Sequence, residues 1–254
     1  GQPIPTYTID YWIDGQHGVY NSTAALAHNT IATLDVTKYL FTPGRHSLRL
    51  AVNVPGDTVQ SNDTISRMIN VRFCAGHYSI GTNGIYSNFN AAVDTLMNAG
   101  VDGNVVFDVA NGTYIEQVNI GAIDGVSPLN TVIFRGDDNN PSNVTLRYAP
   151  TQTENYVLNV DGANYVSFKG IKFTSRATGN YNNVISVSNA TQVRFDSVEV
   201  VTKGGLNNQN ASCMLVGDEV HSMYVTNSHI DSGYCAIRSV RSAAGLSDGL
   251  YINN

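Results

Sequence analysis

The sequence contains few charged residues and no cluster of basic ones. Charged residues make up 13% of the 254-residue chain, about half the usual share, and the formal net charge is −6. Because no run of Lys or Arg is present, we expect no nucleic-acid partner. No apolar run approaches the roughly 18 residues that a membrane-spanning helix requires, so we expect no membrane insertion.

Cysteine is also scarce. Cys74, Cys213 and Cys235 form no C-x-x-C pair, and no His is spaced to complete a zinc site with them. An odd number argues against a disulfide framework but is compatible with one bond. A signal peptide is not visible and the chain begins at Gly1, which indicates a mature or trimmed segment.

Small polar residues and tyrosine are abundant instead. The chain has 29 Asn, 23 Gly and 14 Tyr. Low charge together with many Asn, Gly, Ser and Thr residues is typical of secreted, β-rich repeat proteins rather than of cytosolic helical enzymes.

Residues 1–75 have the pattern of an antiparallel β-structure. The stretch "YTIDYWIDG" alternates and ends in the turn signal Asp14-Gly15, and "HSLRLAVNV" alternates as well. Pro43-Gly44 and Pro55-Gly56 separate the strands. Together with "FTPGRHSLRLAVNVPGDTVQSNDTI", the region resembles the second half of an immunoglobulin-like β-sandwich from secreted bacterial surface proteins. The resemblance implies that the first strands are missing, which leaves an exposed edge.

Residues 76–104 are predicted to hold a linker and a capping α-helix. Apolar residues recur at helical spacing at Phe89, Ala92, Val93, Leu96 and Met97. Ser87 or Asn88 can serve as the N-cap, and Gly100 follows the last turn. A solenoid exposes its apolar core at its end, so a helix placed here would cover that end.

Residues 105–254 repeat with a period of 22 to 30 residues. Aligning "YVSFKGIKFTS", "QVRFDSVEVVT", "SMYVTNSHIDS" and "GLYINN" stacks Val166, Val193, Met223 and Leu250. The same alignment stacks two further lines, Phe168–Phe195–Val225–Ile252 and Phe173–Val200–Ile230, and a separate set joins Leu158, Ile185, Leu215 and Ile237. Short β-strands at this period predict a right-handed parallel β-helix whose last coil is cut off.

Several phrases carry a family resemblance. "CAGHYSIG", "NFNAAVDTLMNAGVDGNVVFDVANGTYIEQVNI" and "NYVLNVDGANYVSFKGIKFT" resemble secreted bacterial proteins that are exported by the type IX system. The likeness covers roughly residues 40–175, and the rest resembles a generic pectin-lyase-like β-helix. It implies a secreted or cell-surface location outside the outer membrane, and an adhesin-like or polysaccharide-related role.

The stretch Gly112-Thr113-Tyr114-Ile115-Glu116 resembles the first coil of pectin methylesterases. In that family this coil is remote from the chemistry, so we interpret Gly112 as a turn residue and Tyr114 as a packing residue. The family's Gln-Asp-Thr-Leu and Asp-Phe-Ile-Phe-Gly motifs are absent between residues 176 and 254. The Gly-His-Gly and Arg-x-Lys motifs of polygalacturonases are also absent, and Asp218-Glu219 is interpreted as a turn.

The remaining polar candidates have both a functional and a structural interpretation. Asp137-Asp138-Asn139-Asn140 could bind Ca²⁺, but a turn explains this stretch better. Arg238 and Arg241 could bind a uronic acid carboxylate, although solvated surface arginines are the commoner case. The six histidines form no cluster, and Trp12 is expected in the core rather than as a sugar platform.

The cysteine spacing makes a specific structural prediction. Cys213 and Cys235 each precede by two residues a position in the aligned set, Leu215 and Ile237. In-register stacking would place both sulfurs inside the solenoid as neighbours in adjacent coils. We expect the pair to be in contact but reduced, with Cys74 unpaired near the junction of the two domains.

The sequence favours a non-enzymatic scaffold, and no catalytic, cofactor or metal residue is assigned. Its expected partners are polysaccharides or other surface proteins, and the chain is expected to continue at both ends. The alternative is a polysaccharide lyase, hydrolase or esterase whose catalytic coils lie partly outside this segment; fold analogy alone supports it.

Overall fold

The computed structural model describes residues 3–202, 208–240, 242 and 248–253. The chain divides into two compact units, Gly1–Val71 and Arg72–Asn254, and each is described by itself. None of the helices within the described ranges is long and apolar enough to cross a membrane.

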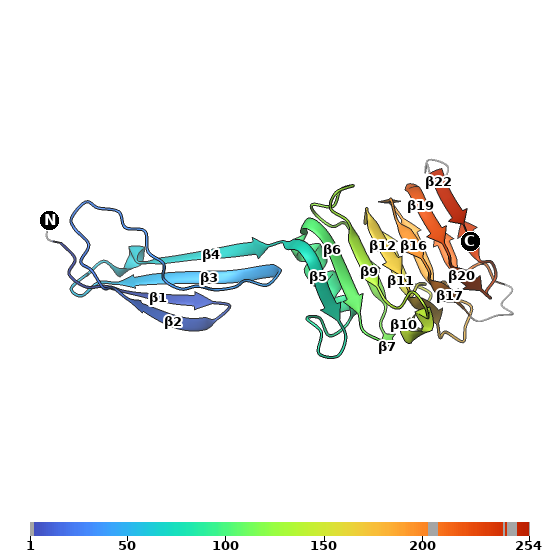
Figure 1. Cartoon of the computed structure of the whole chain (residues 1–254), viewed down its shortest axis with the longest axis horizontal. Helices are drawn as coiled ribbons and strands as arrows, with labels where there is room; N and C mark the ends of the chain where they lie inside the picture. Colours follow the sequence, from blue (N-terminus) through green and yellow to red (C-terminus); the bar gives the residue numbers. More distant parts are fainter. Residues whose placement is uncertain (1–2, 203–207, 241, 243–247, 254) are drawn as a thin grey trace. The chain divides into compact units, whose positions relative to one another are not determined.

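The first unit is built on one antiparallel sheet of four strands in the order β2-β1-β3-β4 (Figure 1). Their bounds are β1 Thr8–Ile13, β2 Gln16–Asn21, β3 Gly44–Asn53 and β4 Thr64–Val71, and a short 3-10 helix, Gln60–Asn62, precedes β4. Asp14 and Gly15 have φ values of 49° and 81°, as a two-residue type I′ hairpin turn requires.

The predicted sandwich is not seen in the described part of this unit, which has strands at the expected places but a single sheet. Residues 34–41 lie beside the apolar side of the sheet instead. With Tyr11, Leu48 and Leu50 they line a cavity of about 290 Å³. Irregular chain therefore takes the position in which a sandwich would have its second sheet.

His46 is a buried histidine that ties two loops of this unit together. Its Nδ1 lies 2.7 Å from an Asp14 carboxylate oxygen, and its Nε2 lies 2.8 Å from the Thr42 carbonyl oxygen. Both ring nitrogens face acceptors, so only the doubly protonated ring donates to both. The hydrogen bond to Asp14 raises the pKa of His46, and the same bond lowers the pKa of Asp14.

This pair predicts a pH-dependent stability of the first unit. A histidine whose pKa is raised on folding stabilises the fold below its ordinary pKa of 6.5, and this stability is lost as the pH rises through the folded pKa. Trp12 is the only tryptophan, so its fluorescence reports on this unit. We expect the urea midpoint of the first unit to be lower at pH 9 than at pH 6, and we expect the variant His46→Gln to show no such decrease. If the urea midpoint of the variant decreased as much between pH 6 and pH 9 as that of the parent, other groups would cause the pH dependence.

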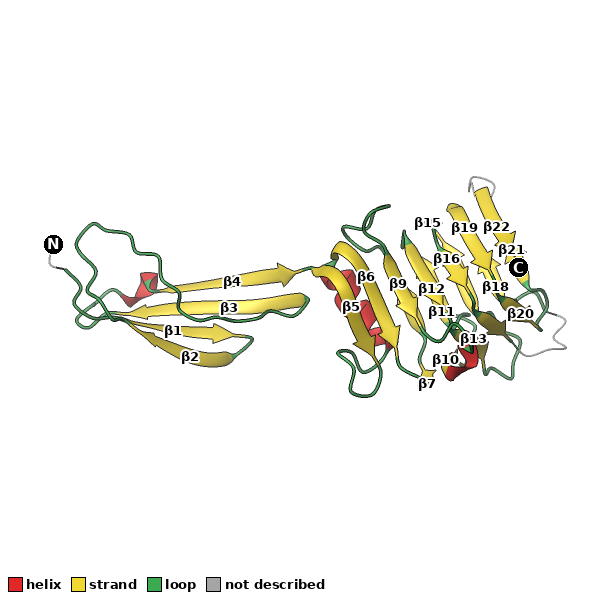
Figure 2. Cartoon of the chain, in the orientation of Figure 1, coloured by secondary structure: helices red, strands yellow, loops and turns green. Residues whose placement is uncertain are grey.

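The second unit is a parallel β-helix, which confirms the solenoid fold predicted from the sequence repeat. Sheet S1 contains β5 Phe73–Ile80, β6 Val101–Val109, β9 Val132–Arg135, β12 Val166–Lys169, β15 Ala190–Thr191, β16 Arg194–Asp196, β19 Val220–Thr226 and β22 Asp248–Asn253. Sheet S2 contains β7 Gly112–Ile115, β10 Val144–Tyr148, β13 Lys172–Ser175, β17 Glu199–Val201 and β20 His229–Asp231. Sheet S3 contains β8 Val118–Ile120, β11 Leu158–Asp161, β14 Ile185–Ser188, β18 Met214–Val216 and β21 Ile237–Ser239. A short 3-10 helix, Pro141–Asn143, precedes β10, and Figure 2 shows the strands of successive coils lying side by side.

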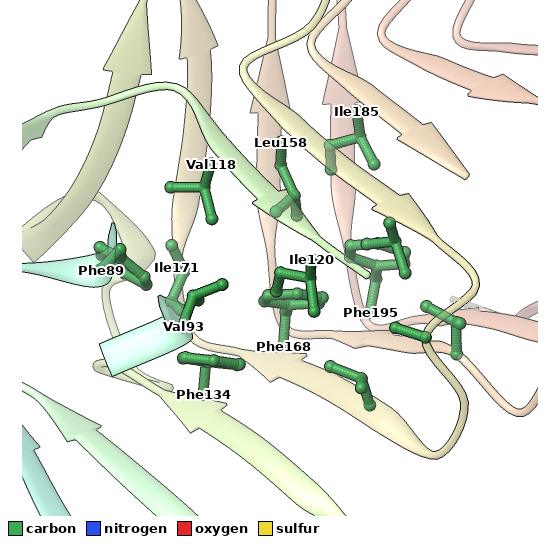
Figure 3. Packing of buried hydrophobic residues seen from close by; sticks show 14 of the residues in the cluster. Phe89, Val93, Val118, Ile120, Phe134, Leu158, Phe168, Ile171, Ile185 and Phe195 are labelled. Atoms are coloured by element: carbon green, nitrogen blue, oxygen red, sulfur yellow. The ribbon is translucent and has the colours of Figure 1, made fainter. Parts of the chain in front are cut away.

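A column of phenylalanine rings fills the interior of the solenoid behind S1. Phe107, Phe134, Phe168 and Phe195 stack in register, with ring centroids 4.9, 5.4 and 5.2 Å apart from one coil to the next. Figure 3 shows the last three of these rings. Val225 and Ile252 continue the line, and Phe173–Val200–Ile230 form a second one, as the alignment predicts. Stacked rings of this size bury a large apolar area without leaving voids.

One predicted register is wrong by a single residue. Ile185 faces Met214 rather than Leu215, and Met214 faces Ile237. Met214 and Val216 are buried, whereas Leu215 is half-buried. The segment between β17 and β18 is longer than its equivalent one coil earlier, so the alignment carried across it lost the register.

The cysteine prediction is confirmed in part. Cys213 and Cys235 are neighbours in adjacent coils, because the Cys213 N–H donates to the Cys235 carbonyl at 3.1 Å, and both are reduced. Cys235 is only partly buried, and its sulfur lies 3.3 Å from the Ser212 Oγ. Cys213 is buried, its thiol donates to the Asp231 carbonyl at 3.2 Å, and burial raises its pKa to about 11. All three cysteines are free.

In four consecutive coils, one residue with a left-handed backbone lies at or near the start of the S1 strand. Tyr165, Gln192, Ser222 and Gly249 occupy equivalent positions and have φ values between 55° and 65°. The backbone at these positions forms hydrogen bonds to the adjacent coil; for example, the Tyr165 N–H donates to the Thr191 carbonyl oxygen at 2.9 Å. Only one of the four is glycine, so composition did not predict this corner.

The predicted helix is present as α1, Phe89–Ala99. The Asn88 side chain accepts from the Ala91 N–H at 2.9 Å, and Gly100 ends the helix at φ 73°. Five apolar residues of its inner side are buried: Phe89, Ala92, Val93, Leu96 and Ala99. The helix packs against β8 and β5.

Candidate functional site

Glu116 positions α1 rather than a substrate. Its two carboxylate oxygens accept from the backbone N–H groups of Phe89 at 3.1 Å and Asn90 at 2.9 Å. A carboxylate at a helix N-terminus satisfies free N–H groups and complements the helix dipole. Tyr114 is buried and donates to the Ala110 carbonyl at 2.8 Å, as a packing residue would. Gly112 has no left-handed φ, so the turn role expected of it is not seen.

The substitution Glu116→Gln is expected to lower the free energy of unfolding by about 1 kcal/mol. A neutral amide has one acceptor oxygen, so one helix N–H loses its partner and the favourable charge disappears. Urea unfolding measures the change, with the exposed Glu154→Gln as the matched control. If this variant bound glycan more weakly but was as stable as the parent, Glu116 would have a role in binding rather than in holding α1.

The acidic pair Asp218-Glu219 lies in the turn between β18 and β19, as predicted. Glu219 has a left-handed φ of 53°, and an Asp218 carboxylate oxygen accepts from the Ser242 N–H at 2.7 Å. His221 Nδ1 lies 3.0 Å from Asp248, which raises the pKa of that histidine. Asp218 and His221 thus each form a contact between this turn and the following coil.

The Asp137 loop is a turn that its own side chain organises. One Asp137 oxygen accepts from the Asn139 and Asn140 N–H groups at 3.0 and 3.3 Å, and the other accepts from Asn143 Nδ2 at 2.8 Å. In the described part of the chain, no group of three or more His, Cys, Asp or Glu side chains is arranged to hold a metal ion.

The arginine and tryptophan candidates have structural partners. Arg238 donates to the carbonyl and the side-chain oxygen of Gln209, both at 3.0 Å, and Arg241 lies outside the described residues. Trp12 is half-buried on β1, so its expected place in the core is wrong. Its ring stacks on His17 at 4.8 Å, and the Arg49 guanidinium carbon lies 4.6 Å from the ring centroid.

The outer face of S1 brings together polar and aromatic side chains that are far apart in the sequence. Ser167, Arg194, Tyr224 and Tyr251 pair in one lateral row across β12, β16, β19 and β22. Neighbouring strands lie about 4.8 Å apart, so the row follows the solenoid axis. The sequence alignment already contained this row, because these residues alternate with the buried line of Phe168 and Phe195.

A groove of about 320 Å³ lies at the end of this row that is formed by Ser167 and Arg194. Its lining is polar and aromatic: Pro128, Thr131, Tyr165, Ser167, Gln192 and Arg194. Tyr165 and Gln192 are two of the left-handed corner residues, so the backbone of the corner itself places their side chains at the groove.

An arginine–tyrosine stack continues from the groove. The Arg194 guanidinium carbon lies 4.1 Å from the centre of the Tyr224 ring, and Arg194 also donates to Gln192 Oε1 at 3.2 Å. The Tyr224 and Tyr251 rings stack at 4.8 Å and are inclined by 12°. Tyr251 is 51% exposed, so an apolar surface remains open to solvent beside a cation.

A row of ion pairs lies on the same face, two residues further along the strands than Ser167 and Arg194. Arg135 Nη2 lies 2.6 Å from Asp108, and His77 Nδ1 lies 2.7 Å from the other oxygen of the same carboxylate. Partial burial alone would raise the pKa of Asp108. The hydrogen bonds from His77 and Arg135 outweigh burial and lower this pKa.

Lys169 lies between two carboxylates further along the row. Its Nζ is 3.0 Å from Asp138 and 3.7 Å from Asp196. The hydrogen bond to Asp138 raises the pKa of Lys169. Burial would raise the pKa of Asp196, but hydrogen bonds from Asn227 and Thr226 and the charge of Lys169 lower it. A general acid of a glycosidase needs a raised carboxyl pKa, and a lysine base needs a lowered one; both shifts here are opposite.

Comparison with known proteins finds similar folds only. No protein-family model and no curated protein matches the chain. A pectin methylesterase from Aspergillus niger is 17% identical with a TM-score of 0.46, over 72% of this chain and 68% of that one. PemA from Erwinia chrysanthemi is 11% identical with a TM-score of 0.46, over 73% and 54%. A Family 28 exopolygalacturonase from Yersinia enterocolitica is 10% identical with a TM-score of 0.33, over 99% and 64%. Likeness at this level assigns no activity.

Proposed function

We propose that the outer face of S1 binds a polysaccharide along the solenoid axis, and that the protein is a non-enzymatic scaffold. The groove beside Tyr165 and Arg194, continued by the stacked Tyr224 and Tyr251 rings, is the observation that carries this proposal.

The chemistry of the face suits a sugar polymer. A sugar ring has a C–H side that packs on aromatic rings and hydroxyl groups that need hydrogen-bond partners. Gln192, Ser167 and Arg194 offer amide, hydroxyl and guanidinium groups in the groove, and Tyr251 offers an exposed ring. Repeated strands present such groups at a regular spacing, which suits a repetitive and extended ligand.

The enzymatic alternative is the weaker reading of this face. Asp138 and Asp196 share one ammonium group, and the lowered pKa of Asp196 keeps it ionised. Both this shift and the raised pKa of Lys169 favour the ionised forms, which suits a structural ion pair better than a proton donor or a lysine base.

The setting of the binding face follows from the sequence resemblance. The protein is secreted or held at the cell surface, and the first unit derives from an immunoglobulin-like module. Helix α1 covers the N-terminal end of the solenoid core, and its five buried apolar residues support that role. Other surface proteins remain candidate partners beside a polysaccharide.

A glycan array followed by calorimetry tests the proposal. We expect binding to weaken about tenfold, or 1.4 kcal/mol, in the double variant Tyr165→Asn, Tyr251→Ala. Asparagine is chosen at residue 165 because it tolerates the left-handed backbone there. The control Tyr234→Ala removes a half-exposed tyrosine between β20 and β21, away from S1, and leaves affinity unchanged. Equal losses in both variants, or release of reducing sugar from the bound glycan, would refute the scaffold proposal.

A further inference from the structure

We infer that the polysaccharide bound by the outer face of S1 is uncharged, and that the face discriminates against polyuronates. This inference rests on the proposed function and adds the chemical class of the ligand. It concerns the charge balance of the ion-pair row and the arginine–tyrosine stack on this face.

The lysine and arginine side chains that the structure describes on this face already have partners. Arg135 is paired with Asp108 at 2.6 Å, and Lys169 with Asp138 and Asp196 at 3.0 and 3.7 Å. The remaining cation, Arg194, is stacked on Tyr224 and bonded to Gln192. Among the described residues, these three cations and three carboxylates sum to zero charge, and Asp248 on β22 adds a further carboxylate. This part of the face therefore holds no excess of positive charge for an anionic chain.

A polyuronate would meet repulsion at the row of ion pairs. It carries a carboxylate on each sugar, so a chain lying along S1 places several negative charges near Asp108 and Asp196. Both carboxylates have lowered pKa values and stay ionised at neutral pH. Residues 72–254 contain 10 Lys and Arg against 15 Asp and Glu, a net charge of −5, which adds repulsion at longer range.

An uncharged chain meets none of these costs. Tyr165, Ser167 and Gln192 hydrogen-bond hydroxyl groups without requiring a charge, and the N–H groups of Arg194 that do not bond Gln192 can do the same. Tyr251 packs against the C–H side of any pyranose. The recognition groups of the groove are therefore those of a neutral glycan site.

The test measures the affinity of the full chain for neutral and for uronate oligosaccharides of equal length. We expect the neutral ligand to bind at least about tenfold more tightly at 50 mM salt. Added salt screens repulsion, so the uronate affinity rises between 50 and 500 mM while the neutral affinity stays constant. A uronate affinity that falls with salt shows attraction and contradicts the inference.

A charge variant provides the internal check. Asp196→Asn removes one carboxylate and leaves Lys169 with a single partner, so the ratio of uronate to neutral affinity rises about fivefold. The control Asp231→Asn makes the same change of charge on S2 and leaves the ratio constant. If the uronate binds as tightly as the neutral ligand, the inference fails while the proposed function stands. If neither class binds, both fail.

Discussion

Replacing Phe168 by alanine is expected to lower the free energy of unfolding of the β-helix by about 3–5 kcal/mol. The ring is 1% exposed and lies between Phe134 at 5.4 Å and Phe195 at 5.2 Å. Removing it leaves a cavity in the middle of the column, because the rings on either side are fixed by the strand register and cannot close the gap.

Urea unfolding followed by circular dichroism measures this loss. Ser167→Ala, one residue earlier on the same strand, is the matched control, because its side chain points outward and its change stays within about 0.5 kcal/mol. A loss below 1 kcal/mol for Phe168→Ala would mean that the column is not a packed core.

The second large effect is expected for Gly136→Ala, at about 2–3 kcal/mol. A methyl group at residue 136 would lie 2.3 Å from the Gly170 carbonyl oxygen and 3.1 Å from side-chain atoms of Ile171 and Val144. The nearest of these atoms belongs to the backbone of the next coil and is held by the Asp137 N–H at 2.9 Å. It can move only if the two coils separate.

Gly179→Ala is the control for this substitution, because a methyl group there meets no atom within 4 Å. Its unfolding free energy should stay within about 0.5 kcal/mol of the parent. If Gly136→Ala matched Gly179→Ala, the close approach of the coils at residues 136 and 170 would be wrong.

The solenoid could be predicted because its core obeys a simple rule. Apolar residues alternate along each strand and recur one coil later, so Phe168, Phe195 and Val225 could be aligned from the sequence. The rule fails where the coil length changes. Between β17 and β18 the loop differs in length, and the alignment at Leu215 moved by one residue.

The coil corners and the binding face were harder to predict, for two physical reasons. Tyr165, Gln192 and Ser222 adopt a backbone that is normally associated with glycine or asparagine, so their identities carry no turn signal. The groove residues come from three coils and are polar, and polar outward residues vary without cost to the core. The alignment places Ser167 opposite Arg194 and Tyr165 opposite Gln192, but it carries no signal that this outward row forms a groove.

A crystal structure of the protein soaked with a neutral oligosaccharide is the decisive test of the proposed binding face. We expect sugar rings in the groove beside Tyr165 and Arg194, with the chain continuing toward Tyr251 along S1. An oligosaccharide ordered on the outer face of S2 or S3, with the groove on S1 empty, would contradict it.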